Sequence, residues 1–330
     1  MKKLNLNVKK FNVFIKKFSL SKFLPSRNIR PFIICTMARS GTWYNRQFFY
    51  FYNQLLMDKS KDEIISQIIQ TDKKLKYFQK LDKNKFNFDS VFIQHWLCPG
   101  FVESYNGKYR RQWDKLEFYS DHLPEKFNDL MNYYNVYDKI NPLKNINAKI
   151  IYYYRNPLDQ NISHFNAIQT NVVQELNYYF DKSSQKNQRF KDIHQYLRVA
   201  GMDMYIKHYL SFKLMKEKFP NNILILEYEN LTRNPEENFR KVLKFINFDL
   251  TNKNESQFKD ALFLSSKENI VKLENKLGHA FSKSFKDKNK RQLSDGRTGR
   301  WKEILKNEDI KFIDSRLNEF DLKLSDFILN

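Results

Sequence analysis

Apolar residues along the chain form short unbroken runs and longer stretches with helical spacing. The first run, residues 31–36, predicts a buried strand, and the aromatic-rich residues 43–56 after it have the length of a helix. Residues 59–80 carry isoleucines at helical spacing, which predicts an amphipathic helix packed on the core. These isoleucines are Ile64, Ile65, Ile68 and Ile69.

Two more apolar runs, residues 91–93 and 116–119, are candidate strands. The stretch between them contains Pro99, Gly100 and Gly107, which are typical of a long polar loop. We therefore expect an insertion between these two strands.

The second half of the chain continues the alternation of strands and helices. Residues 148–154 are β-branched and aromatic, which predicts an interior parallel strand, and Pro157 can open the following helix. Residues 223–228 predict another buried strand, between a helix at residues 202–219 and a helix that starts near Asn234. This alternation predicts an α/β fold with a doubly wound parallel sheet of about five strands.

The last third of the chain has a weaker pattern. After Asp249 the sequence is richer in polar residues and less periodic, until Trp301 starts a closing helical stretch. No internal repeat or linker interrupts the chain, so we expect a basic N-terminal extension, residues 1–30, and one domain, residues 31–330. A hydrophobic content of 41% over 330 residues is enough for a sizeable core.

The formal net charge of +21 predicts attraction to polyanions, but it does not choose among nucleic acid, an anionic membrane, an acidic glycan and a nucleotide. The lysines are spread along the chain, so a solvated basic surface is the alternative interpretation. Residues 11–23 mix Phe and Leu with Lys, which allows an interfacial helix and peripheral membrane contact. The N-terminus lacks the apolar stretch of a signal peptide or a membrane span.

The chain contains two cysteines, Cys35 and Cys98. They provide neither a disulfide framework nor the ligand pairs of a zinc site. We therefore expect a cytoplasmic protein, with peripheral attachment to a membrane as the alternative.

Residues 36–42, between the first strand and its helix, form a candidate anion-binding loop. Backbone N–H groups at a helix start favour an anion, and Gly41 allows close approach of the backbone. Ser40 and Thr42 add hydroxyl donors, and Arg39 adds a permanent charge in a forked geometry. The GxxxxGK[ST] pattern of nucleotide triphosphatases is not present. An ordinary strand-to-helix turn with a surface arginine is the alternative.

A second candidate phosphate site follows the strand at residues 148–154. Ligands collect at the carboxyl ends of strands in open α/β sheets, and Arg155 lies at such an end. Ser163 comes two turns into the next helix and could converge with Arg155 on one phosphate. Alternatively, Arg155 only pairs with Asp159 at the start of that helix.

Together the two segments resemble the nucleotide motifs of the sulfotransferase family, which uses 3′-phosphoadenosine 5′-phosphosulfate (PAPS). Residues 37–42 are similar to the family's PKSGT or PRSGT loop for the 5′-phosphosulfate, with Ala38 in place of proline. Residues 155–163 match the family's RNPxDxxxS motif for the 3′-phosphate. The resemblance implies a P-loop-like central parallel sheet flanked by helices on both faces, and PAPS as co-substrate.

Weaker matches extend the resemblance along most of the chain. Tyr205 lies in the helix where the family has an adenine-contacting aromatic residue, and Ser265 starts a segment similar to SSFEN. Residues 296–302 are similar to the GxxGxWK loop that closes over the 3′-phosphate, although Ser294 replaces the family's arginine. The implied cofactor-binding residues are Arg39, Ser40, Gly41, Thr42, Trp43, Arg155, Ser163, Tyr205, Ser265, Arg297, Thr298 and Gly299.

Sulfuryl transfer resembles phosphoryl transfer, in which the protein positions the reactants in line and stabilises charge. Arg39 is suited to the leaving-group oxygen, and the scheme requires no metal. A hydroxyl or amine acceptor needs a general base, and histidine is the usual candidate. His122 resembles the histidine of the family's THLP motif, with Asp121 in place of threonine, and His95 is the second candidate.

The sequence leaves the acceptor open. Residues 99–113 include Tyr105, Tyr109 and Trp113, an aromatic and basic mixture that suits a carbohydrate, a phenol or a lipid alcohol. We expect a small-molecule or glycan acceptor and no nucleic-acid partner. A P-loop nucleotide kinase and a non-catalytic protein that binds polyanions or membranes are the alternative functions.

Overall fold

The computed structural model describes residues 32–70, 92–94, 98, 149–169, 178–181, 184, 186–278 and 298–328. The candidate strand at residues 116–119, the loop at residues 99–113 and the N-terminal residues 1–30 lie outside these ranges.

The described part of the sheet has four parallel strands in the order β2-β1-β3-β6. The strands are β1 (Phe32–Thr36), β2 (Phe92–Gln94), β3 (Lys149–Tyr154) and β6 (Ile223–Glu227). All four were expected from the sequence pattern, and no bound differs from the expected one by more than one residue. β3 is an interior strand between β1 and β6, as its apolar sequence predicts.

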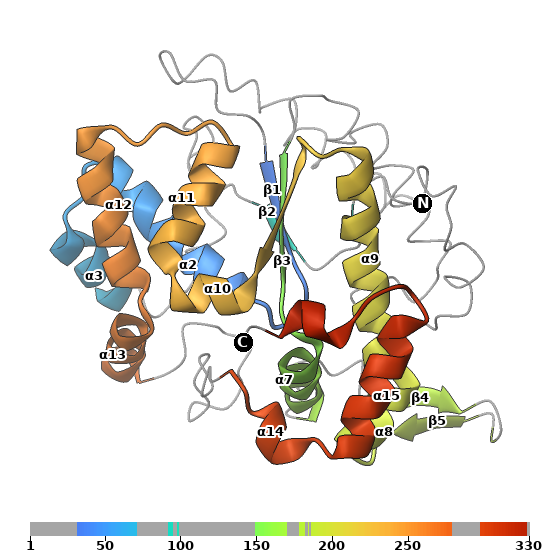
Figure 1. Ribbon diagram of the computed structural model, residues 1–330. Helices are drawn as coiled ribbons and strands as arrows, with labels where there is room; N and C mark the ends of the chain where they lie inside the picture. The colour runs from blue at the N-terminus through green and yellow to red at the C-terminus, as the bar shows by residue number, and fades with distance from the viewer. Residues whose placement is uncertain are drawn as a thin grey trace, which may run out of the picture.

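Helices cover both faces of this sheet (Figure 1), because the side chains of β3 alternate between two cores. Tyr152 packs with α7 (Pro157–Gln169), α9 (Met202–Lys218) and α15 (Asn307–Asn318), and its ring stacks on Phe212 at 3.8 Å. Tyr153 lies in the opposite core. That core is built from α2 (Thr42–Leu56), α11 (Pro235–Phe245) and α12 (Asn252–Ser265). The predicted α/β fold class is confirmed.

Short elements complete the described chain. They are α3 (Lys61–Gln70), the antiparallel pair β4 (Tyr178–Asp181) and β5 (Lys186–Arg189), α8 (Ile193–Tyr196), the π-helix η5 (Leu197–Gly201), α10 (Tyr228–Arg233), α13 (Lys267–Leu277), α14 (Trp301–Ile304) and the 3₁₀ helix η6 (Leu324–Phe327). None of the helices in the described ranges has both the length and the apolar content needed to cross a bilayer.

Two expectations need correction. The tail after Asp249 is helical, as α12 and α13, where the sequence pattern indicated little order. Thr251 and Ser266 cap these helices by accepting from backbone N–H groups, and the buried residues of α12 recur three positions apart, so tertiary packing compensates for a polar composition. In α3, Ile64 is buried but Ile69 is 38% exposed, because Ile69 faces away from the core.

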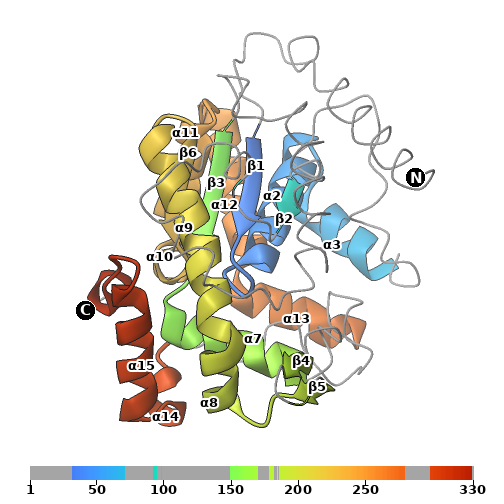
Figure 2. The ribbon, with the colours of Figure 1, turned by 90° about the vertical axis from the view of Figure 1, so that its right-hand side faces the viewer.

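The carboxyl ends of the strands meet α7. In both views α7 lies beneath these strand ends, and α13 and α14 also lie below the sheet (Figures 1 and 2). The chain therefore gathers its two predicted anion motifs at one edge of the sheet.

Candidate functional site

The loop between β1 and α2 is a tight turn. The Ser40 N–H donates to the Met37 carbonyl at 3.0 Å, and Arg39 adopts a left-handed backbone conformation with φ of 69°. Gly41 has φ of 89°, and a Cβ there would lie 3.0 Å from the side chains of Tyr228 and Leu231. Position 41 therefore requires glycine, for both its conformation and its space.

Hydroxyl groups line this turn at the start of α2. The Thr36 and Thr42 hydroxyls share a hydrogen bond of 2.7 Å. The Ser40 hydroxyl is fully buried and has no hydrogen-bond partner among the described residues. A buried polar atom without a partner costs free energy, so this hydroxyl suits a ligand that accepts from it or donates to it.

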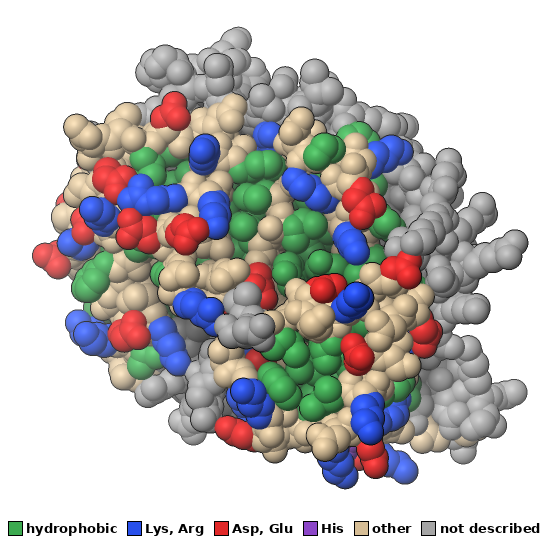
Figure 3. All heavy atoms as spheres, in the orientation of Figure 1, with side chains coloured by type: hydrophobic (Ala, Val, Ile, Leu, Met, Phe, Trp, Pro, Cys, Tyr) green, Lys and Arg blue, Asp and Glu red, His purple; other side chains and the backbone are tan. Residues whose placement is uncertain are grey.

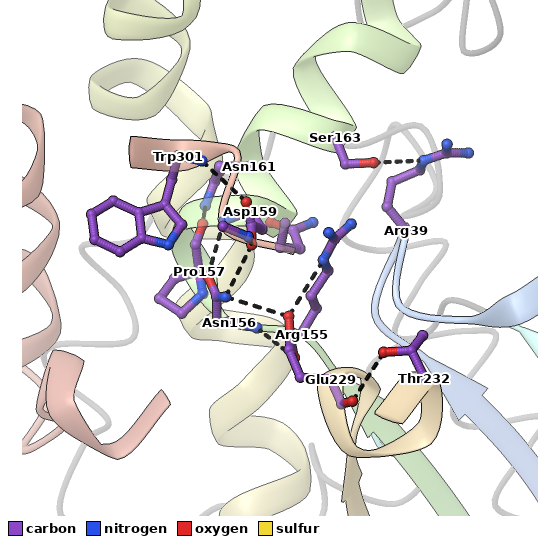
Figure 4. Close-up of polar contacts among 12 residues, drawn as sticks. Arg39, Arg155, Asn156, Pro157, Asp159, Asn161, Ser163, Glu229, Thr232 and Trp301 are labelled. Carbon is purple, nitrogen blue, oxygen red and sulfur yellow. Dashed lines mark hydrogen bonds and ion pairs between the residues drawn. The ribbon is translucent and has the colours of Figure 1, made fainter. Parts of the chain in front are cut away.

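Arg39 links the loop to α7. Its Nε donates to the Ser163 hydroxyl at 3.2 Å (Figure 4), so a residue of the first motif contacts a residue of the second. Burial lowers the pKa of Arg39, and the nearby charge of Arg155 lowers it further. The two guanidinium groups are therefore close enough to repel each other, and an anion between them would be stabilised.

Arg155 follows β3 and is held on several sides. Its guanidinium lies over the ring of Tyr228 at 4.8 Å, and its Nε is 3.5 Å from the Glu229 carboxylate. The Tyr205 hydroxyl donates to the Arg155 carbonyl at 2.8 Å. Within the described ranges, Arg155 pairs with Glu229 of α10 and not with Asp159, contrary to the alternative interpretation.

Glu229 is a buried acid next to this arginine. The backbone N–H and the side-chain amide of Asn156 donate to its two oxygens at 3.4 and 3.3 Å. Burial raises the pKa of Glu229 to about 7, although the charge of Arg155 opposes the rise. The acid therefore titrates near neutral pH.

Asp159 instead joins α7 to the turn before α14. Its carboxylate accepts from the backbone N–H of Gly299 at 2.6 Å. It also accepts from the backbone N–H of Trp301 at 3.2 Å (Figure 4). Gly299 has φ of 86°, a conformation that favours glycine. The Gly299 amide, expected as a phosphate contact, is thus engaged by Asp159.

Other predicted site residues have different surroundings. Tyr205 is 1% exposed and belongs to the core, and Ser265 is buried, with its hydroxyl donating to the Ala261 carbonyl of its own helix. Trp43 is partly buried, with the Arg46 guanidinium 4.9 Å from its ring, and Thr298 is exposed. His95, His122 and Arg297 lie outside the described residues.

Three contributing residues were missed by the sequence interpretation: Gln160, Tyr228 and Glu229. Gln160 donates from α7 to the Ala38 carbonyl of the anion loop at 3.1 Å. Tyr228 and Glu229 directly follow β6, and polar residues directly after a buried strand are the signal that could have indicated them. Gln160 falls on a variable position of its motif and gives no such signal.

The geometry as a whole is suited to an anionic ligand with two charged groups. One arginine and two hydroxyls follow β1, a second arginine follows the neighbouring strand β3, and Ser163 of α7 accepts from the first arginine. No cluster of side chains able to hold a metal ion occurs among the described residues.

Comparison with known protein families identifies a domain over most of the chain. The model of the sulfotransferase domain matches residues 30–324.

Curated relatives agree with this match over part of their length. The chain is 26% identical over 179 residues to the flavonol 3-sulfotransferase of Flaveria bidentis, covering 52% of the chain and 54% of the relative. It is 27% identical over 180 residues to the flavonol 4′-sulfotransferase of Flaveria chlorifolia, covering 53% of each protein. The chain thus spans about half the length of the curated relatives it matches.

Solved structures with a similar arrangement include a retinol dehydratase complexed with androsterone and the inactive cofactor PAP. That chain has a TM-score of 0.48 and 13% identity, with 97% of this chain and 87% of that chain covered. A mouse sulfotransferase complexed with PAP has a TM-score of 0.43 and 14% identity, with 91% and 87% covered.

Proposed function

Because the chain belongs to the sulfotransferase domain family, we propose that it transfers a sulfuryl group from PAPS to a hydroxyl or amine of an acceptor. The observation that carries the proposal is the pairing of Arg39 with Arg155. The two residues follow neighbouring parallel strands, and the charge of one lowers the pKa of the other. Such a pair is suited to a nucleotide with phosphate groups at both ends.

The described residues fit PAPS. The Ser40 hydroxyl is buried without a partner, and with Thr42 and Gly41 it would hold the 5′-phosphosulfate at the start of α2. Arg155 and Ser163 would hold the 3′-phosphate.

When bound, PAPS would supply an activated sulfuryl group. Arg39 carries a fixed positive charge that would stabilise negative charge on the transferred group and on the leaving oxygen. Its left-handed backbone and its bond to Ser163 hold that charge in place before a ligand arrives, so little reorganisation is needed.

For the general base we favour His95 over His122. β2 pairs in parallel with β1, and Gln94 lies opposite Cys35, one residue before the end of β1. His95 is the next residue in the sequence. It therefore follows the carboxyl end of β2, and the anion loop follows the carboxyl end of the parallel strand β1.

The acceptor is proposed to be a small molecule with a phenolic or alcoholic hydroxyl. The curated relatives are named for flavonols, which carry phenolic hydroxyls, and this supports the phenol among the alternatives left open by the sequence. A screen that includes a flavonol, a sterol and a sugar would identify the class.

A calorimetric titration with adenosine 3′,5′-bisphosphate tests the nucleotide site. We expect saturable binding to the wild-type protein, and binding at least about tenfold weaker in Arg155→Ala and Ser163→Ala, because each loses a hydrogen bond to a phosphate. Arg240→Ala is the matched control, since Arg240 pairs with Glu236 and Glu255 on the surface. Absence of wild-type binding, or tighter binding of ATP, would contradict the proposal.

The proposed base is tested by two histidine variants. His95→Ala should lower kcat by about 10²–10⁴-fold while it leaves bisphosphate affinity unchanged, because a base acts in the chemical step. His122→Ala should retain turnover. The reverse result would assign the role to His122.

A further inference from the structure

The turn that presents Arg39 lacks the residues that would stabilise it locally. The hydrogen bond from Ser40 to Met37 makes residues 37–40 a β-turn. A positive φ occurs at its third position, Arg39, but not at its second, Ala38, and this combination defines a type II turn. Type II turns prefer glycine at the third position and commonly have proline at the second. The chain has arginine and alanine there.

Gln160 holds the peptide group that distinguishes this turn from its commoner alternative. A type I turn differs from a type II turn by a flip of the central peptide, which here joins Ala38 to Arg39. The side-chain Nε2 of Gln160 donates to the carbonyl of that peptide, at 3.1 Å. A flipped peptide would turn this carbonyl away from the donor, so the hydrogen bond selects the type II form.

The burial of Gln160 indicates that position 160 carries glutamine for its amide donor. The side chain is 4% exposed, and its Oε1 has no hydrogen-bond partner among the described residues. An apolar side chain would fill the same space without leaving a buried oxygen unpaired. Gln160 and Ser163 are three positions apart on α7 and share a face, so this face contacts both the peptide before Arg39 and the Arg39 side chain.

We propose that Gln160 is a positioning residue for the sulfuryl-transfer site, which fixes the Ala38–Arg39 peptide and through it directs the Arg39 guanidinium. This proposal rests on the proposed function only where bisphosphate binding is measured. Its structural part, selection of the turn, holds for whatever anion the loop takes.

The experiment compares Gln160→Leu, Ala38→Pro and the double variant. Leucine keeps the volume and removes the donor, so bisphosphate affinity should fall about tenfold, and kcat should fall with it. Proline sets the φ that the second position of a type II turn requires, so the double variant should regain most of the wild-type affinity. A residue that only supported α7 would not be rescued by a change in the loop.

Gln169→Leu is the matched control. Gln169 also lies on α7 and donates to a backbone carbonyl, that of Phe190, away from the loop. Its variant should bind the bisphosphate as the wild type does. Equal affinities of Gln160→Leu and wild type, or an unrescued double variant, would overturn the proposal. So would impaired binding in Ala38→Pro alone, which would be incompatible with a type II turn.

Hydrogen exchange separates this proposal from the proposed function. The Ser40 amide is bonded across the turn, so it should exchange faster in Gln160→Leu and return to the wild-type rate in the double variant. This readout needs no nucleotide. If wild type binds no bisphosphate but the exchange pattern holds, the proposed function fails and Gln160 still fixes the turn. If the Ser40 amide exchanges at the same rate in Gln160→Leu and wild type, Gln160 does not fix the turn.

Discussion

At the scale of residues, two positively charged side chains of the site, Arg39 and Arg155, lie near the buried acid Glu229. Arg39 and Arg155 repel each other, and Glu229 lies 3.5 Å from Arg155. Removing a partner from a buried ion pair leaves an uncompensated charge, so Glu229 stabilises Arg155 when no anion is bound. The pKa of about 7 makes this ion pair sensitive to pH in the physiological range.

Glu229 should make the stability of the protein fall as pH rises from about 5 to about 8. Its pKa in the folded protein, about 7, is above the ordinary value of 4.5, so the folded state binds more protons between these values. The free energy of unfolding therefore decreases through this range, by about 2–3 kcal/mol at most. Chemical denaturation at pH 5 and pH 8 measures the difference.

Glu229→Gln cannot ionise and should lose this dependence on pH. Glu237→Gln, at an exposed position on α11, should keep the wild-type dependence. If all three proteins lose stability equally between the two pH values, Glu229 is not the group responsible.

At the scale of elements, the strands were predictable and the contacts between distant elements were not. After Lys149, β3 consists of isoleucines and tyrosines, a composition typical of a buried strand, so its position could be predicted from its sequence. The bond between Asp159 and the turn before α14 depends on how α7 and α14 pack, which no local pattern records. The helices α12 and α13 were missed because their caps and buried faces are hidden in a polar sequence.

The π-helix η5 was also unexpected, and its glycine allows α7 to approach closely. A Cβ at Gly201 would lie 2.2 Å from Asn161 Oδ1 and 2.7 Å from a ring carbon of Tyr196. Gly201→Ala should therefore destabilise the protein by about 1–3 kcal/mol through overpacking, measured as a lower Tm. Val199→Ala, on the partly exposed side of the same π-helix, should cost less. Equal Tm values for wild type and Gly201→Ala would contradict the close packing.

At the scale of the whole molecule, the net charge of +21 is a poor guide to the site. On the face shown in Figure 3, lysine and arginine side chains alternate with acidic ones over α11 and α12. Several of these charges are paired, as in Arg240 with Glu236 and Lys241 with Glu237. Over α11 and α12 this face therefore offers a polyanion a surface of mixed sign, and the two buried arginines of the site are a small part of the total charge.

The residues expected to contact the ligand were predicted from the sequence, whereas the residues that orient them were not. Arg39, Ser40, Arg155 and Ser163 carry recognisable motifs because each would contact the ligand, and the structure brings these residues together. The residues that contact them come from α7 and α10: Gln160 through one hydrogen bond, Tyr228 through its ring and Glu229 through an ion pair. Such contacts leave no periodic trace in a sequence.

The bond from Asp159 to Gly299 and Trp301 joins positions 140 and 142 residues apart. Contacts of such sequence separation form slowly, because a long loop must close before they form. During synthesis the chain emerges from its N-terminus, so Asp159 meets its two amide donors only after at least 140 further residues have been made. A ligand that binds only the finished site therefore reports the end of folding.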